Sequence, residues 1–129
     1  MKKYEDHIRQ YLEERNWHNL RPADIAKSIS IESAELLEIF QWTNQTLEEV
    51  KNDKEKMEKI KHELADVLTY CFDMSVLLGF DTGEILLNKL EKVKLKYPAH
   101  LFKNRNDDVD AGSEEVYWKI KKEHRMKGE

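Results

Sequence analysis

The sequence predicts an all-α fold. The 129 residues include only four glycines and two prolines, and strand-like alternation of apolar and polar residues is absent. Apolar residues instead recur at helical spacing, between faces rich in charge. Hydrophobic residues make up 40% of the chain and the mean hydropathy is −0.81, which is a lean core but well above the composition of a disordered chain. We therefore expect a single domain, residues 1–129, of long amphipathic helices that complete their core by oligomerisation.

The first two helices are delimited by residue types that favour or break a helix. Ile8 and Leu12 stand four residues apart, which is the spacing of one helical face. A polar break follows, and Pro22 suits the first turn of the next helix. The pattern predicts helices over about residues 4–14 and 23–42, with a break at 16–21 and a polar connector at 43–47.

Three further helices are expected, again marked by their ends. Gly79 fits the C-terminal cap of the third helix. Asp81 or Thr82 suits the N-terminal cap of the fourth, which must stop before Pro98. Ser113 begins a short last helix. The expected spans are a third helix entered from the charged stretch 48–61 and ending at residue 78, a fourth over 82–96, a loop over 99–112, and a last helix to about residue 124.

Composition excludes several classes of function. The net charge of −4 and the pI near 5.8 argue against a partner that is a nucleic-acid polymer or an anionic membrane. The single cysteine, Cys71, excludes an internal disulfide and is expected in the core of a protein from a reducing compartment. The N-terminal residues lack the apolar run of a signal peptide, and Asp66 and Asp73 interrupt the most apolar stretch, Leu64–Phe80. We expect a cytoplasmic protein.

Two carboxylate pairs are the most informative feature of the chain. Glu32-x-x-Glu35 and Glu63-x-x-Asp66 each place two carboxylates three residues apart on an expected helix. If these helices pack together, four oxygen-bearing side chains meet in one place. Like charges in such a place raise one another's pKa, and a divalent cation would offset the repulsion. Ligands that are all oxygen suit hard ions such as Mg²⁺.

Chance is the alternative, because charged residues make up 37% of the chain and such pairs also occur on solvated helix faces. A helical projection places Glu32 inside an apolar stripe and Glu63 on the shoulder of another, where unpaired carboxylates are rare. Glu38 points further from its stripe, as a surface residue or an outer member of the acidic site. The expected apolar stripe of the third helix consists of Ile60, Leu64, Val67, Cys71, Met74 and Leu78.

Other chemistries find little support in the sequence. The motif that begins at His62 lacks the second histidine of a zinc protease, and no Glu-x-x-His pair of the di-iron type involves the acidic residues. A glycine-rich phosphate loop is absent. Some side chains would suit a nucleotide, although for each aromatic alone core packing or partial exposure is the favoured explanation, and a solvated face suffices for the lysines. They are Trp17, Trp42, Tyr97 and Phe102 for a base, and Lys89, Lys92, Lys94 and Lys96 for phosphates.

The chain resembles the MazG-like nucleoside triphosphate pyrophosphohydrolases, an all-α family. Residues 31–42, IESAELLEIFQW, resemble the family's first motif, and residues 63–70, ELADVLTY, resemble its second. The Arg15-Asn16-Trp17 element and the Lys89…Lys92 and Lys96-Tyr97-Pro98 elements also occur in the family's order, over roughly residues 14–98. The single-domain form is closest to the dCTP pyrophosphatase-like branch. Two departures, Val93 where that branch has Asn and a shortened 17–32 segment, leave the preferred base open.

The resemblance implies a fold and an activity. The fold is a four-helix bundle-type domain with its core at about 4–98, a C-terminal loop and short helix at 99–129, and a dimer or tetramer as the assembly. The activity is hydrolysis of a nucleoside or deoxynucleoside triphosphate to the monophosphate and pyrophosphate, in nucleotide-pool house-cleaning. Alternatives are a catalytically inactive nucleotide- or metal-binding protein and a helical oligomerisation module. The resemblance also implies a site in which Glu32, Glu35, Glu63 and Asp66 bind Mg²⁺, or Mn²⁺ in its place. Glu35 or Glu38 would be the general base. The implied substrate contacts are Lys89 and Lys96 for the phosphates, and Trp17, Trp42 and Tyr97 for the nucleobase.

Overall fold

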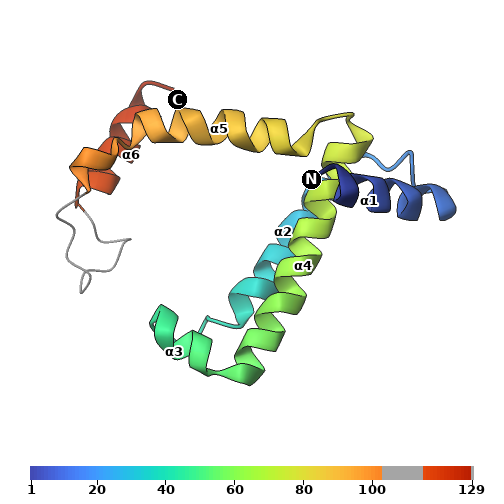
Figure 1. The fold of residues 1–129 in the computed structure, drawn as a ribbon. Helices are drawn as coiled ribbons and strands as arrows, with labels where there is room; N and C mark the ends of the chain where they lie inside the picture. The colour runs from blue at the N-terminus through green and yellow to red at the C-terminus, as the bar shows by residue number, and fades with distance from the viewer. Residues whose placement is uncertain (103–114, 129) are drawn as a thin grey trace. The chain divides into compact units, whose positions relative to one another are not determined.

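The computed structural model describes residues 1–102 and 115–128. Within these residues the chain forms helices and no strand, which confirms the all-α prediction. It divides into two units, Met1–Gly83 and Glu84–Glu129. None of the described helices is both long and apolar enough to cross a membrane. The elements in order are α1 (Lys2–Glu14), α2 (Pro22–Glu38), α3 (Leu47–Asn52), α4 (Lys54–Leu77), α5 (Thr82–Lys96), the 3₁₀ turn η1 (Ala99–Leu101) and α6 (Glu115–Met126) (Figure 1).

In the first unit, α4 is the central element. Helix α2 runs alongside it, α1 packs near its C-terminal end and α3 contacts its N-terminal part (Figure 1). Leu12 of α1, Ile25 of α2 and Val76 of α4 are the buried apolar residues. This core is small, since apolar residues of α4 such as Leu64 and Leu68 are exposed. The two helices that carry the acidic pairs are therefore direct neighbours.

Helix α2 ends at Glu38, four residues before the end that the apolar pattern predicts. After Leu37 the backbone tightens into turns: the Phe40 amide donates to the Leu37 carbonyl at 2.9 Å, and the Thr43 amide donates to the Phe40 carbonyl at 3.2 Å. Hydrogen bonds to the third preceding residue commonly close a helix in this way. Trp42 consequently lies outside the helix and is 87% exposed.

The expected third helix is two helices, because the chain is extended at Asp53. A capping box begins α3: the Thr46 hydroxyl accepts from the Glu49 amide at 3.2 Å, and the Glu49 carboxylate accepts from the Thr46 amide at 2.9 Å. The Asp53 carboxylate then accepts from the Lys56 amide at 3.0 Å and begins α4. The charged stretch at 48–61 thus contains a helix boundary.

The turn between α4 and α5 follows the predicted signals. Gly79 has φ of 73°, the left-handed conformation expected just after a helix, and α5 begins at Thr82. The Thr82 hydroxyl lies 2.6 Å from the Ser75 hydroxyl in a buried hydrogen bond. The Thr82 amide donates to Glu5 Oε1 at 2.8 Å, and hydrogen bonds from the Thr82 side chain and then its backbone lower the pKa of Glu5. The start of α5 is thereby tied to α1.

The predicted apolar stripe of α4 is wrong for three residues. Leu64, Cys71 and Leu78 are exposed in this chain. Helix α2 covers the neighbouring side of α4, which carries Asp66 and Tyr70, so the helix is rotated relative to the expectation. The placement of Cys71 in the core is therefore not correct for the single chain.

The second unit is organised by aromatic contacts. The ring of Tyr97, just after α5, stacks on Tyr117 of α6 with centroids 5.2 Å apart and an interplanar angle of 17°. Phe102 meets Tyr97 edge-on at 6.3 Å. Beside them, Lys121 Nζ lies 5.0 Å from the centroid of Trp118. The expected start of the last helix at Ser113, and most of the expected 99–112 loop, lie outside the described residues.

Candidate functional site

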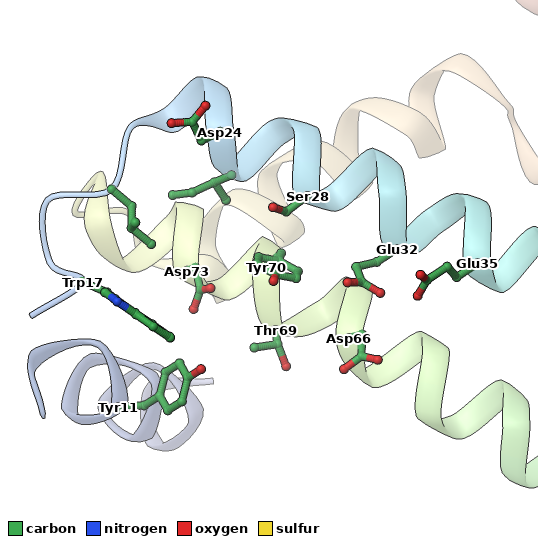
Figure 2. Close-up of a pocket in the computed structure, with 12 residues that line it drawn as sticks. Tyr11, Trp17, Asp24, Ser28, Glu32, Glu35, Asp66, Thr69, Tyr70 and Asp73 are labelled. Carbon is green, nitrogen blue, oxygen red and sulfur yellow. The ribbon is translucent and has the colours of Figure 1, made fainter. Parts of the chain in front are cut away.

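A cavity of about 470 Å³ lies in the first unit, lined by α1, α2, α4 and the segment that joins α1 to α2 (Figure 2). In the view, Glu32, Glu35 and Asp66 lie at one end of it, and the aromatic rings of Tyr11 and Trp17 lie at the other. Its lining residues are Tyr11, Trp17, Leu20, Asp24, Ile25, Ser28, Glu32, Glu35, Asp66, Thr69, Tyr70 and Asp73.

Helical periodicity explains why these residues meet. On α2, Ser28 and Glu32 are four residues apart, and Glu35 follows three residues later, so all three share one face. On α4, Asp66, Tyr70 and the later Asp73 share a face in the same way. Because α2 and α4 lie side by side, the two faces form opposite walls of the cavity.

The acidic cluster is formed by Glu32 from α2 with Glu63 and Asp66 from α4. One carboxylate oxygen from each of the three lies within 4.8 Å of the others, and all three residues are half-buried. Oxygen Oε2 of Glu63 is buried and has no hydrogen-bond partner among the described residues. Glu35 lies beside the cluster, as Figure 2 shows, and is more exposed. Three of the four carboxylates in the two acidic pairs thus lie close together, and their role as metal ligands stays a prediction.

The electrostatics of the cluster are dominated by repulsion. A hydrogen bond with Glu35 raises the pKa of Glu32, and burial and the charges of the neighbouring carboxylates raise it further. Burial raises the pKa of Glu63, and the charge of Glu35 adds to the effect, while His62 lowers it. Converging oxygens, a buried oxygen with no partner and mutual repulsion together fit a hard divalent cation. The donor set contains no sulfur or nitrogen ligand.

The other predicted site residues of the first unit differ in position. Trp17 lines the cavity, and its ring meets Tyr11 edge-on with centroids 5.8 Å apart and an interplanar angle of 74°. The Arg15 guanidinium lies 4.3 Å from the centre of the Tyr11 ring. Glu38 and Trp42 are exposed and do not line the cavity.

Lys89, Lys96 and Tyr97 belong to the second unit. Lys89 and Lys96 line a cavity of about 430 Å³ together with Lys92 and His124. Lys96 Nζ lies 5.4 Å from the centre of the Tyr97 ring. The basic residues of α5 therefore gather at a pocket of their own unit.

Sequence reasoning missed several cavity residues, of which Asp73 is the most unusual. It is 3% exposed, and its Oδ1 has no hydrogen-bond partner among the described residues. Burial raises the pKa of Asp73 to about 6. A signal did exist, since Asp73 follows Asp66 by seven residues, which is the spacing of one helical face. In the sequence alone, Asp73 stands out only as an interruption of an apolar stretch.

Comparison with known proteins identifies the family. A model of the MazG-like family matches residues 27–110, more than half of the chain and a span that includes both acidic pairs. The chain is also similar to the crystal structure of a pyrophosphatase from Archaeoglobus fulgidus DSM 4304, with 38% sequence identity, a TM-score of 0.65, and coverage of 76% of this chain and 92% of that one. A search of curated proteins gave no match. On the family match and this structural likeness, and in agreement with the resemblance of its motifs, the chain belongs to the MazG-like family.

Proposed function

We propose that this protein hydrolyses a nucleoside or deoxynucleoside triphosphate to the monophosphate and pyrophosphate, in nucleotide-pool house-cleaning. The observation that carries the proposal is the convergence of Glu32, Glu63 and Asp66, with oxygens within 4.8 Å of one another, in a half-buried cluster. This cluster adjoins a cavity whose other end carries an aromatic pair. Membership of the MazG-like family and similarity to a pyrophosphatase support the same reaction.

Glu32, Glu63 and Asp66 would hold Mg²⁺, or Mn²⁺ in its place, with Glu35 next to them. When bound, such a cation neutralises triphosphate charge and lowers the pKa of a water molecule. The unpartnered Oε2 of Glu63 and the raised pKa of Glu32 support this assignment, because both features describe a site short of positive charge.

Glu35 is the better candidate for the general base. It lies beside the cluster and lines the cavity, yet it is exposed and stands outside the group of three close oxygens. A carboxylate in that position can accept the proton of an attacking water molecule. Glu38, the alternative base, is the last residue of α2 and does not line the cavity.

Substrate contacts follow from the other end of the cavity. The rings of Trp17 and Tyr11 offer apolar faces and edges on which a base can stack. Lys89 and Lys96 stay the predicted phosphate contacts, and Trp42 and Tyr97 stay predicted base contacts.

Product analysis tests the reaction. A panel of ribo- and deoxynucleoside triphosphates, dCTP included, is incubated with the protein and Mg²⁺, and the products are separated by chromatography. We expect monophosphate and pyrophosphate as first products, with no turnover in the presence of EDTA. A diphosphate and orthophosphate as first products would refute the assigned reaction. No turnover, with a melting temperature that Mg²⁺ still raises, would favour an inactive binding protein, and no effect of Mg²⁺ at all would favour an oligomerisation module.

We also propose a homo-oligomer. Leu64 and Leu68 of α4 are exposed, and α1 and α4 border an apolar groove of about 450 Å³ that includes Ile8 and Phe72. Apolar surface of this kind commonly marks an interface. Light scattering should give a mass of at least two chains of 15.4 kDa each. An active species with the mass of one chain would contradict the proposed assembly.

A further inference from the structure

Asp73 is a buried carboxyl group for which the described protein supplies no hydrogen-bond donor at Oδ1. The residue is 3% exposed and lines the candidate active-site cavity. Burying such a group without a partner costs free energy, so buried polar atoms of this kind are uncommon in native proteins and call for an explanation. The lining residues of the cavity include no lysine, arginine or histidine that could compensate it. A ligand that brings its own N–H donors would.

The position of Asp73 relates it to the acidic cluster. It follows Asp66 by seven residues on α4, or about 10 Å along the helix axis. Figure 2 shows its carboxyl group toward the end of the cavity that holds Trp17 and Tyr11, with Glu32 and Glu35 at the other end. A nucleotide with its phosphates at the cluster would have its base near the Trp17 ring, with one edge toward Asp73. This step rests on the function proposed above.

We propose that Asp73 determines base specificity by accepting hydrogen bonds from the Watson–Crick edge of guanine. An ionised carboxylate only accepts hydrogen bonds, through two adjacent oxygens. Guanine offers two adjacent donors, N1–H and the 2-amino group. Adenine and cytosine place an acceptor nitrogen beside their amino group, and uracil and thymine place their single N–H between two carbonyls. Guanine is therefore the one common base whose edge matches the carboxylate at both oxygens.

The titratable groups described around the cavity include no cation, so burial alone sets how strongly the fold opposes ionisation of Asp73. They are Tyr11 from α1, Asp24, Glu32 and Glu35 from α2, and Asp66 and Tyr70 from α4. Burial raises the pKa of Asp73 to about 6, which still leaves the carboxyl largely ionised at pH 7.5. The two N–H groups of guanine would offset the loss of hydration that burial imposes.

The test compares GTP with ITP, whose base lacks only the 2-amino group. For the wild-type protein at pH 7.5 with Mg²⁺, we expect kcat/KM to be about ten- to a hundred-fold higher for GTP, the effect of one hydrogen bond to a charged group. In Asp73→Asn the amide nitrogen would face the 2-amino group, so the ratio should fall to one or below. UTP should gain, because the amide offers both a donor and an acceptor. Glu55→Gln, on the exposed surface of α4, should keep the wild-type ratio.

Equal kcat/KM for GTP and ITP in the wild-type protein, or a preference for CTP, ATP or UTP, would overturn the assignment, and these measurements do not depend on a variant that folds. If no triphosphate is hydrolysed, the proposed function fails and calorimetry with GMP and IMP decides the inference separately. At least ten-fold tighter binding of GMP that Asp73→Asn abolishes would support the role of Asp73. Equal binding, or no binding of either nucleotide, would refute it.

Discussion

Asp66→Asn is expected to lower pyrophosphate release by at least about a hundred-fold, while the far-ultraviolet circular dichroism stays that of the wild-type protein. Asp66 contributes an oxygen to the group of three close carboxylates, and a neutral amide is a poor ligand for Mg²⁺. The variant should also lose the rise in melting temperature that Mg²⁺ gives the wild-type protein, since ligand binding stabilises only a fold that binds it.

The variant Glu35→Gln distinguishes the role of general base from the role of metal ligand. The exposed Glu35 carboxylate lies outside the three close oxygens, so this variant should lose turnover to a similar extent and yet keep much of the stabilisation by Mg²⁺. Glu55→Gln is the matched control, because the Glu55 side chain is exposed and pairs with Lys59 on the surface of α4. Wild-type rates in Asp66→Asn would mean that the cluster is ordinary surface charge.

Asp73→Asn is expected to make the ligand-free protein more stable at pH 8 by up to about 3 kcal/mol. The pKa of Asp73 rises from 3.8 to about 6 in the fold, so between these values the folded chain holds a proton that the unfolded chain has released. Stability therefore falls as the pH rises through this window, and the loss is complete only above about pH 7, where the folded group is itself ionised. The neutral amide does not ionise and avoids the loss.

Urea unfolding at pH 5 and pH 8 measures this effect. The stability difference between Asp73→Asn and the wild-type protein should be about half as large at pH 5 as at pH 8. Glu32 and Glu63 also have raised pKa values, but they are present in both proteins and cancel in the difference. A difference that shrinks as the pH rises would contradict a buried, ionised Asp73.

Local signals in the sequence located most of the fold. Pro22, Gly79 and Thr82 act through the backbone of their own turns, so the ends of α2, α4 and α5 near them were predictable. The break between α3 and α4 was not, because Asp53 sits among charged and polar residues with no glycine or proline to mark it. The rotation of α4 depends on which side α2 covers, and apolar residues on several sides of α4 leave that choice to packing.

Among the residues of the candidate site, some were likewise predictable from local spacing, and others depend on tertiary packing. The two acidic pairs were predictable, because spacing along a helix fixes which side chains share a face. Trp17 was found through its motif, whereas Tyr11 reaches the cavity only when α1 packs near it. In the sequence Asp73 resembles an interruption in an apolar run. Its place in the candidate site follows only from its burial beside an aromatic pair.

The three tryptophans have different surroundings, so intrinsic tryptophan fluorescence can report on ligand binding. Trp17 lines the cavity, Trp42 is 87% exposed, and Trp118 belongs to the other unit, beside Lys121. A base that stacks on an indole quenches its emission, so a nucleotide in the cavity would dim Trp17, while Trp42 contributes the red-shifted light of an indole in water. With Trp42 and Trp118 replaced by phenylalanine, the fluorescence of one residue would follow occupancy of the cavity in real time, without a label.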